Sequence, residues 1–313
     1  MNFRLYPLRF GFAARDTIFF PPGKSSNLLR GAFGTIFRKM ACAPECPGAR
    51  ECDAREACPY ARMFEPSALD GGPSGLVNWP RPFVFRASRL DGRTVSAGTT
   101  FSFDLNLFDM RSPAVAYLVL TFAQVAREGL GPGRGRADLT GVWRLGEREE
   151  PVSQVFDGQR FLLQDGPAPM EIRLTAEEPV ARVKVRFVTP TELKSAQEVS
   201  SRPEFHVLAG RIRDRLSTLR ACYDEGPLDL DFRAFGERAA RVRMTRCEIG
   251  RVEVERRSSR TGQSHSIGGF VGEAEYVGEL GEFMPYLKAA QWTGVGRQTV
   301  WGKGEIAIQP ASQ

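Results

Sequence analysis

One order of elements occurs twice along this chain, and this repetition is the strongest constraint on its fold. An alternating apolar segment at 2–14 predicts a strand, and apolar residues at helical spacing predict a helix over 26–41. Two strands, a helix and a strand follow, within 82–87, 99–109, 113–128 and 140–145. The order β-α-β-β-α-β is typical of the ferredoxin-like fold.

The second half repeats this order. Residues 180–190 predict a strand and Pro203 to Tyr223 a helix capped by Ser200 or Ser201. A hairpin, a short helix and a last strand follow, within 247–280, 282–294 and 304–309. The sequence therefore predicts an α+β protein of two tandem ferredoxin-like (βαββαβ, RRM-like) domains, at 1–176 and 177–313. The first carries a Cys-rich insertion at 42–58.

In each half a glycine-rich, basic segment separates the last helix from the last strand. The segments are GLGPGRGRADL, from residue 129, and GVGRQTVWGKGEI, from residue 294. The second is no dinucleotide fingerprint, because Thr299 stands where GxGxxG requires glycine. It is no Walker A loop either. That motif has four residues between its first glycine and the Gly-Lys pair, whereas five residues separate Gly296 from Gly302 and Lys303.

The charge distribution favours an anionic partner. The chain has a net charge of +6, and only six of its 43 basic residues are lysines. From Arg211 to Arg260 there are thirteen arginines and no lysine. Arginine suits bidentate phosphate contacts, so this region predicts binding to nucleic acid.

Four of the six cysteines are clustered at residues 42, 46, 52 and 58. Four thiolates in a short loop are the ligands that structural zinc or an iron–sulfur cluster requires. The alternative is four unrelated thiols in a variable insertion. Cys222 and Cys247 are expected to be single buried thiols. The first residues lack a secretory signal and no segment could span a bilayer, so we expect a cytoplasmic protein without a membrane partner.

The chain resembles the RAMP superfamily of CRISPR-associated proteins, and within it the precursor-crRNA-processing endoribonucleases. The stretches that carry the resemblance are LLRGAFGTIFRKMAC with CPYARMFEP, VRFVTPTELK, RIRDRLSTL, RSSRTGQSHSIGGFVGEAEYVGEL and FMPYLKAAQWTGVGRQTVWGKGEIAI. The resemblance covers most of the chain and is densest from residue 180 onward.

The resemblance implies cleavage of CRISPR repeat RNA, with no cofactor needed for catalysis. In this reaction a ribose 2′-OH attacks the adjacent phosphate, which leaves a 2′,3′-cyclic phosphate and a 5′-OH. Many relatives place a catalytic histidine near the first helix, where this chain has none, and others place one where Thr293 stands. The candidate catalytic residues are therefore the two histidines, His265 and His206. Relatives without an active histidine use Lys, Arg or Tyr, so Lys24, Lys39 and Tyr60 are the alternatives.

The resemblance also implies an RNA-binding surface at the second glycine segment and at the hairpin tip. Glycines would let the RNA backbone approach closely, and basic side chains would meet phosphates. The candidate RNA-binding residues are Gly294, Gly296, Arg297, Gly302, Lys303, Gly304, Arg257 and Arg260.

Two rival functions remain open. The chain could be a non-catalytic subunit that holds guide RNA in a CRISPR effector complex, beside other effector subunits, which would explain the missing first-domain histidine. It could also be a Cys-cluster redox or metal-sensing protein whose basic surface is incidental.

Overall fold

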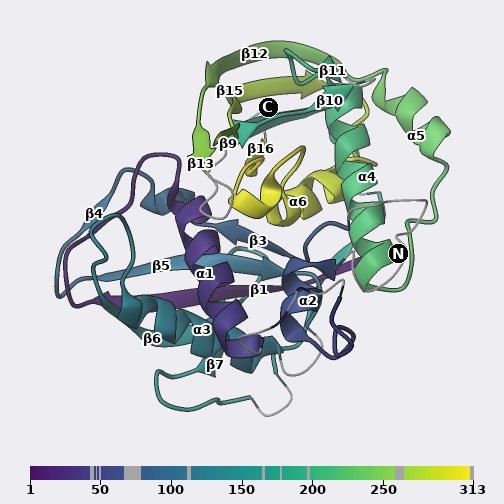
Figure 1. Ribbon diagram of the computed structural model, residues 1–313. Helices are drawn as coiled ribbons and strands as arrows, with labels where there is room; N and C mark the ends of the chain where they lie inside the picture. The colour runs from purple at the N-terminus through teal and green to yellow at the C-terminus, as the bar shows by residue number, and fades with distance from the viewer. Residues whose placement is uncertain are drawn as a thin grey trace. The chain divides into compact units, whose positions relative to one another are not determined.

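The computed structural model divides into two compact units. The N-terminal unit consists of residues 4–170 and 222–224, and the C-terminal unit of residues 1–3, 171–221 and 225–313 (Figure 1). The predicted boundary after residue 176 lies close to this division. The structure describes all residues except 43–45, 47, 49–50, 67–78, 111–113, 164–165, 177, 196–197, 258–263 and 311–313.

The first strand of the N-terminal unit is the centre of an antiparallel sheet. This strand, β1 (Asn2–Ala14), pairs with β5 (Thr100–Leu107) on one side and with β6 (Ala137–Leu145) on the other. The sheet order is β3-β5-β1-β6-β7, with β3 at Phe83–Arg86 and β7 at Pro151–Phe156, and β8 (Met170–Arg173) also pairs with β1. Two short strands, β2 (Ile18–Phe19) and β4 (Thr94–Val95), form a separate pair.

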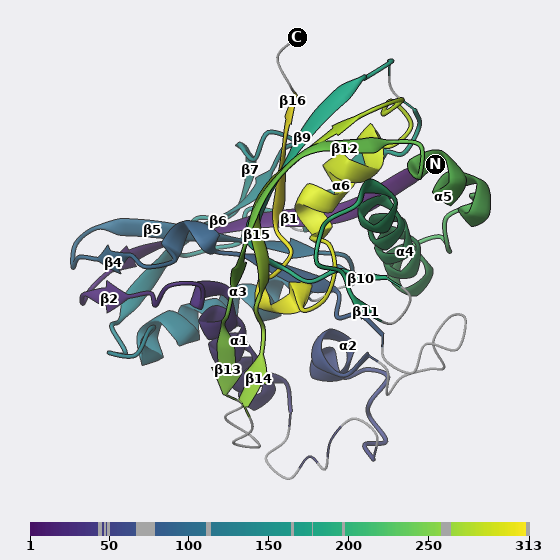
Figure 2. The same cartoon turned by 90° about the horizontal axis from the view of Figure 1, so that it is seen from above.

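Helices α1 (Ser25–Ala41) and α3 (Ala114–Glu128) pack against one face of this sheet, and α2 (Pro59–Phe64) packs on α1 (Figures 1 and 2). Alternation along β1 turns Leu8, Phe10 and Phe12 toward the helices, and each is at most 1% exposed. Phe33 of α1 lies at the centre of this core. Its ring contacts aromatic rings of α1, α2, β3 and α3, namely Phe37, Phe64, Phe83, Phe85 and Phe122.

The C-terminal unit has the same topology. Its first strand, β9 (Arg182–Thr191), lies between β15 (Gly269–Val277) and β16 (Ile306–Pro310), and β12 (Arg243–Val252) pairs with β15. Its helices are α4 (Phe205–Tyr223), α5 (Phe232–Ala239) and α6 (Met284–Thr293). Short hairpins are formed by β10 (Lys194–Ser195) with β11 (Glu198–Val199) and by β13 (Glu255–Arg257) with β14 (Ser264–Ser266). Both units therefore have the predicted ferredoxin-like order.

The helix starts differ from the sequence prediction. Asp91, far away in sequence, accepts hydrogen bonds from the Ser25 backbone N–H at 2.9 Å and from the Ser25 hydroxyl, at the start of α1. Helix α4 begins at Phe205, two residues after Pro203, and the Ser200 hydroxyl donates to the Arg202 carbonyl instead of capping the helix. Helix α5, which was not predicted, is capped by Asp231. A distant carboxylate as a cap is a tertiary contact that local sequence does not reveal.

Helix α3 is amphipathic, and its buried side includes Leu118, Phe122 and Val125. Its exposed side carries Leu120, which is 52% exposed. Among the helices that the structure describes, none has both the length and the apolar character needed to cross a membrane.

The aromatic core predicts a large effect of truncating Phe33. We expect Phe33→Ala to lower the free energy of unfolding by about 3–5 kcal/mol, because the surrounding rings cannot close the cavity. The matched change Leu120→Ala on exposed α3 surface is expected to cost less than about 0.5 kcal/mol. Denaturant unfolding of both variants measures the difference, and equal losses would contradict this placement of the core.

Candidate nucleic-acid interface

The second glycine segment forms a tight loop between α6 and β16. Its four glycines, at 294, 296, 302 and 304, have positive φ angles of 71°, 79°, 74° and 69°. Gln298 also adopts the left-handed conformation, with a φ of 64°. A side chain is strained at such angles, so the loop depends on its glycines.

Close contacts explain two of these glycines directly. A Cβ atom at Gly304 would lie 1.9 Å from the Val295 carbonyl oxygen, and one at Gly296 would lie 2.3 Å from the Glu192 carbonyl oxygen. The Val295 N–H donates to the Gly304 carbonyl at 2.9 Å, so the two ends of the loop are joined. At positions 296 and 304, the missing Cβ atoms therefore make room for the chain itself.

The loop rests on the end of β9 and the residues that follow it. Three hydrogen bonds hold it there: Gly304 N–H to Pro190 O at 3.1 Å, Arg297 N–H to Glu192 O at 3.1 Å, and Glu305 N–H to Thr189 Oγ1 at 2.9 Å. The sequence indicated only a strand in VRFVTPTELK. Its role as the support of the loop depends on contacts with residues more than 100 positions away.

The first glycine segment closes in the same way in the N-terminal unit. Gly129 and Gly131 have positive φ angles of 105° and 75°. A Cβ atom at Gly131 would lie 2.5 Å from the Phe19 carbonyl oxygen, and one at Gly135 would lie 2.4 Å from the Thr17 carbonyl oxygen. Residues 17–19 follow β1 as Glu192 follows β9. In both units, the glycine loop closes against the chain just beyond the central strand.

The two basic residues of the second loop lie in different environments. The Arg297 guanidinium forms an ion pair with the Glu192 carboxylate, and its side chain remains 52% exposed. Lys303 is only 3% exposed. The sequence predicts both side chains to be placed for phosphate contact, but only Arg297 is at the surface.

The structure joins the glycine loop to the basic hairpin. The Gln298 side-chain amide donates a hydrogen bond of 3.0 Å to the carbonyl oxygen of Ser266 in β14. In this hairpin His265 pairs with Arg256, and Ser264 pairs with Arg257. Arg260 lies outside the described residues. The backbone of His265 is thus adjacent to the residue that binds the loop, a connection that the sequence suggested only through resemblance.

The other histidine, His206, lies away from this contact. It is the second residue of α4, and its side chain is exposed. Helix α4 contacts the start of the loop through Arg215, whose Nε donates to the Thr293 carbonyl at 2.9 Å. Nine residues of helix, about 14 Å along its axis, separate His206 from Arg215. His265 is therefore adjacent in sequence to a residue that binds the loop, whereas His206 is about 14 Å along α4 from the residue that does so.

Many arginines between residues 211 and 260 are paired with carboxylates, which the sequence count did not show. These pairs are Arg213–Asp214 at 2.6 Å, Arg238–Glu282 at 2.6 Å, Arg246–Glu248 at 2.7 Å and Arg251–Glu253 at 2.8 Å. The hydrogen bond to Glu248 raises the pKa of Arg246, and the one to Glu253 raises the pKa of Arg251. These guanidinium groups therefore already have carboxylate partners within the chain.

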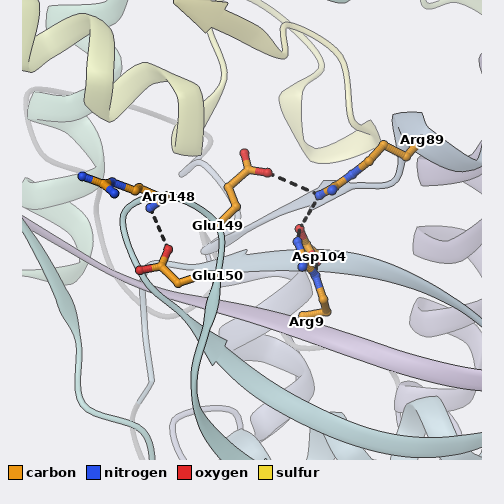
Figure 3. A network of polar contacts seen from close by, with 6 residues as sticks. All are labelled: Arg9, Arg89, Asp104, Arg148, Glu149 and Glu150. Atoms are coloured by element: carbon orange, nitrogen blue, oxygen red, sulfur yellow. Dashed lines mark hydrogen bonds and ion pairs between the residues drawn. The ribbon is translucent and has the colours of Figure 1, made fainter.

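A polar network also lies on the N-terminal sheet (Figure 3). Buried Asp104 of β5 accepts two hydrogen bonds from Arg9 of β1, at 2.7 and 2.8 Å, and one from Arg89 at 2.9 Å. Arg89 is 63% exposed and reaches Glu149 at 3.4 Å. The hydrogen bond to Asp104 raises the pKa of Arg9. Arg9 and Asp104 are cross-strand partners, and this pair was not anticipated from the sequence.

The alternative catalytic residues near α1 lie in ordinary structural positions. Lys24 precedes the first helical residue and is exposed, and Lys39 is exposed in the last turn. The Tyr60 ring stacks on Phe64 with a centroid distance of 5.0 Å. Burial raises the pKa of Tyr60, which makes it a poor base near neutral pH.

The four clustered cysteines all line one small cavity. They are free thiols and half-buried, as are Cys222 and Cys247, which the sequence predicts to be buried. Burial, with smaller contributions from Cys58 and Cys46, raises the pKa of Cys42 to about 12. Among the described residues, no three or more His, Cys, Asp or Glu side chains form a ready-made metal site.

Family models match both parts of the chain. Residues 185–306 match the family model of the CRISPR-associated endoribonuclease Cas6, and residues 3–168 match a model described as AF_1859_N, N-terminal domain. The C-terminal part of the chain therefore carries a Cas6-family domain, which supports the resemblance to CRISPR-associated proteins of the RAMP superfamily. The Cas6 match contains the glycine loop, the hairpin and both histidines. No curated protein sequence matches the chain.

Solved Cas6 structures share the fold along the whole chain. A Cas6 product complex has a TM-score of 0.56 at 16% identity, covering 98% of this chain and 99% of that one. Thermus thermophilus Cas6 has a TM-score of 0.55 at 14% identity, covering 99% of each chain. A further Cas6 product complex has a TM-score of 0.51 at 17% identity, covering 99% of this chain and 100% of that one.

The second glycine loop should tolerate no side chain at Gly304. We expect Gly304→Ala to lower the free energy of unfolding by more than about 1 kcal/mol, because φ is positive and the Val295 carbonyl blocks the new Cβ. Gly236→Ala in α5 is the control, since its Cβ would meet nothing within 4 Å. Thermal or denaturant unfolding measures both variants. Equal stability of both variants would mean that the loop does not close as described.

Proposed function

We propose that this protein is a crRNA-processing endoribonuclease that binds CRISPR repeat RNA and cleaves it without a metal ion. The observation that carries the proposal is the Cas6 family match over 185–306, which spans the glycine loop and the hairpin bonded to it. Two of the structures with the same fold are Cas6 product complexes. Cleavage by attack of the ribose 2′-OH would leave a 2′,3′-cyclic phosphate and a 5′-OH.

The reaction needs a base for the 2′-OH, an acid for the leaving 5′-oxygen and positive charge beside the phosphate. His265 is the better candidate for proton transfer, because its backbone neighbours Ser266, which is bonded to the glycine loop. Arg256 is its cross-strand partner, and Arg257 follows in the same strand. His206 is the second candidate, at the exposed start of α4.

The cleavage assay uses purified protein and end-labelled repeat RNA in EDTA. We expect cleavage to persist in EDTA and to stop when the nucleotide preceding the cut carries a 2′-deoxyribose. His265→Ala should lower the single-turnover rate about 10²–10⁴-fold with little change in Kd, because it removes a proton-transfer group. His206→Ala serves as the comparison and should retain most of the activity. Full activity of His265→Ala would refute its assignment.

A second function is supported by the histidine content. Relatives with a histidine near the first helix have a group that this chain lacks there. The chain would then be a non-catalytic subunit that holds guide RNA beside other CRISPR effector subunits. One structure of the same fold is a partial Cas6-RT-Cas1–Cas2 complex, of whose matched chain this protein covers 46%. Tight repeat-RNA binding without cleavage by the unaltered protein would favour this function.

Contact between Arg297 and RNA can be tested with two variants that should have opposite effects on binding. Glu192→Gln removes the carboxylate that pairs with Arg297, so we expect tighter binding of repeat RNA, and Arg297→Ala should weaken it. If Arg297 meets one phosphate, Arg297→Ala should reduce the slope of log K against log salt by about 0.7 on single-stranded RNA. Filter binding over a salt series measures both quantities.

The control for this test is Arg238→Ala. Arg238 is also paired with a glutamate and is similarly exposed, but it lies on α5. Identical losses for Arg238→Ala and Arg297→Ala would indicate a general charge effect. The contact at the loop would then be rejected.

A further inference from the structure

The cysteine segment joins two helices of the N-terminal unit. Cys42 is the residue after the last turn of α1, and Cys58 is the residue before the first turn of α2. Cys46 and Cys52 lie between them along the chain, and all four line the same cavity. We propose that these four cysteines bind one zinc ion, which fastens the start of α2 to the end of α1.

The burial pattern separates the thiols from the carboxylates. Between residues 51 and 58, Cys52, Arg55 and Cys58 are half-buried. The acidic residues of the same stretch, Glu51, Asp53 and Glu56, are exposed. The cavity is thus surrounded by soft sulfur donors rather than by carboxylates. Such a donor set selects zinc over magnesium or calcium.

The number and proximity of the thiols favour a single ion. All four line one small cavity. Cys46 and Cys58 lie close enough to Cys42 to contribute to the raised pKa of its thiol. Four thiolates at about 2.3 Å from one zinc ion lie about 3.8 Å from each other, which agrees with this close approach. A cubic iron–sulfur cluster would hold its cysteine sulfurs much farther apart.

Two arginines at the cavity would compensate the negative charge of a zinc–thiolate site. A zinc ion with four thiolates carries a net charge of about −2, which a partly buried site has to compensate. Arg38 and Arg55 both line the cavity. Arg38 also donates to the Cys46 carbonyl at 3.5 Å and lies 5.8 Å from the centre of the Tyr60 ring. The guanidinium groups therefore lie where the excess negative charge would form.

The site has a structural consequence for α2. This helix has six residues, too few to be stable alone, and it contributes Phe64 to the aromatic core around Phe33. A zinc ion bound at Cys42 and Cys58 would hold its start against the end of α1. The ion would also draw the four sulfurs into the tetrahedron that the free thiols do not yet form.

The test begins with the full chain, purified without chelators and analysed for metals. We expect about one zinc per chain, no iron or acid-labile sulfide, and a colourless protein. Replacement by Co²⁺ should produce the visible absorption of a tetrahedral thiolate site. Titration with a mercurial reagent should release zinc in step with thiol modification and lower the melting temperature.

Variants locate the site. Cys46→Ser and Cys52→Ser, made singly, should each lose most of the bound zinc, whereas Cys222→Ser and Cys247→Ser should keep it. If a variant of the cluster does not fold, the mercurial titration of the unaltered protein still decides the question. Repeat-RNA binding, measured in parallel, is independent of this proposal, so failure of one leaves the other standing.

Four results would overturn the proposal. Detection of iron with acid-labile sulfide would mean that the cysteines bind an iron–sulfur cluster instead of zinc. If the protein contains no metal and fewer than six free thiols are counted in denaturant, the missing thiols form disulfides. Six free thiols without metal, or zinc that is lost from the Cys222→Ser or Cys247→Ser variant, would reject the site.

Discussion

The main sheet of each unit has the unit's first strand paired on both sides, and that constraint shapes the rest of both units. β1 is paired on both sides by β5 and β6, and β9 by β15 and β16. The last strand of each unit must therefore return beside the first. The chain that leads from the last helix to this strand passes close to the segment that leaves the central strand. Only a backbone without side chains fits where the two cross, which accounts for a glycine loop in each unit.

This steric origin changes the interpretation of the glycine segment. Its glycines first serve the fold, because Gly296 and Gly304 face carbonyl groups of the chain itself. The surface that the loop offers to a ligand comes from other groups, chiefly the exposed Arg297 and the hairpin held by Gln298. A loop whose conformation is fixed by its own contacts is nevertheless suited to binding, because little conformational entropy of the loop is lost when a ligand binds.

The number of arginines in the sequence and their pairing in the folded chain give different impressions of the surface charge. A net charge of +6 and a run of thirteen arginines indicate an anionic partner. In the folded chain, several of these arginines are paired with nearby carboxylates, such as Arg246 with Glu248 and Arg251 with Glu253. These pairs keep guanidinium groups extended at the surface, where phosphate can compete for them. An anionic ligand would have to displace these carboxylates, so its affinity would depend on that exchange as well as on the formal charge.

The sequence by itself determined the order of elements, because apolar periodicity and glycine positions are local properties. It also determined the two glycine loops, the cysteine spacing and the resemblance that the family match supports. Only the tertiary structure decided that Asp91 caps α1, that Lys303 is buried, that Asp104 binds two arginines, and that His265 rather than His206 lies beside the glycine loop. These facts depend on residues far apart in the chain, and their pairing follows from sheet register and packing, which no local pattern encodes.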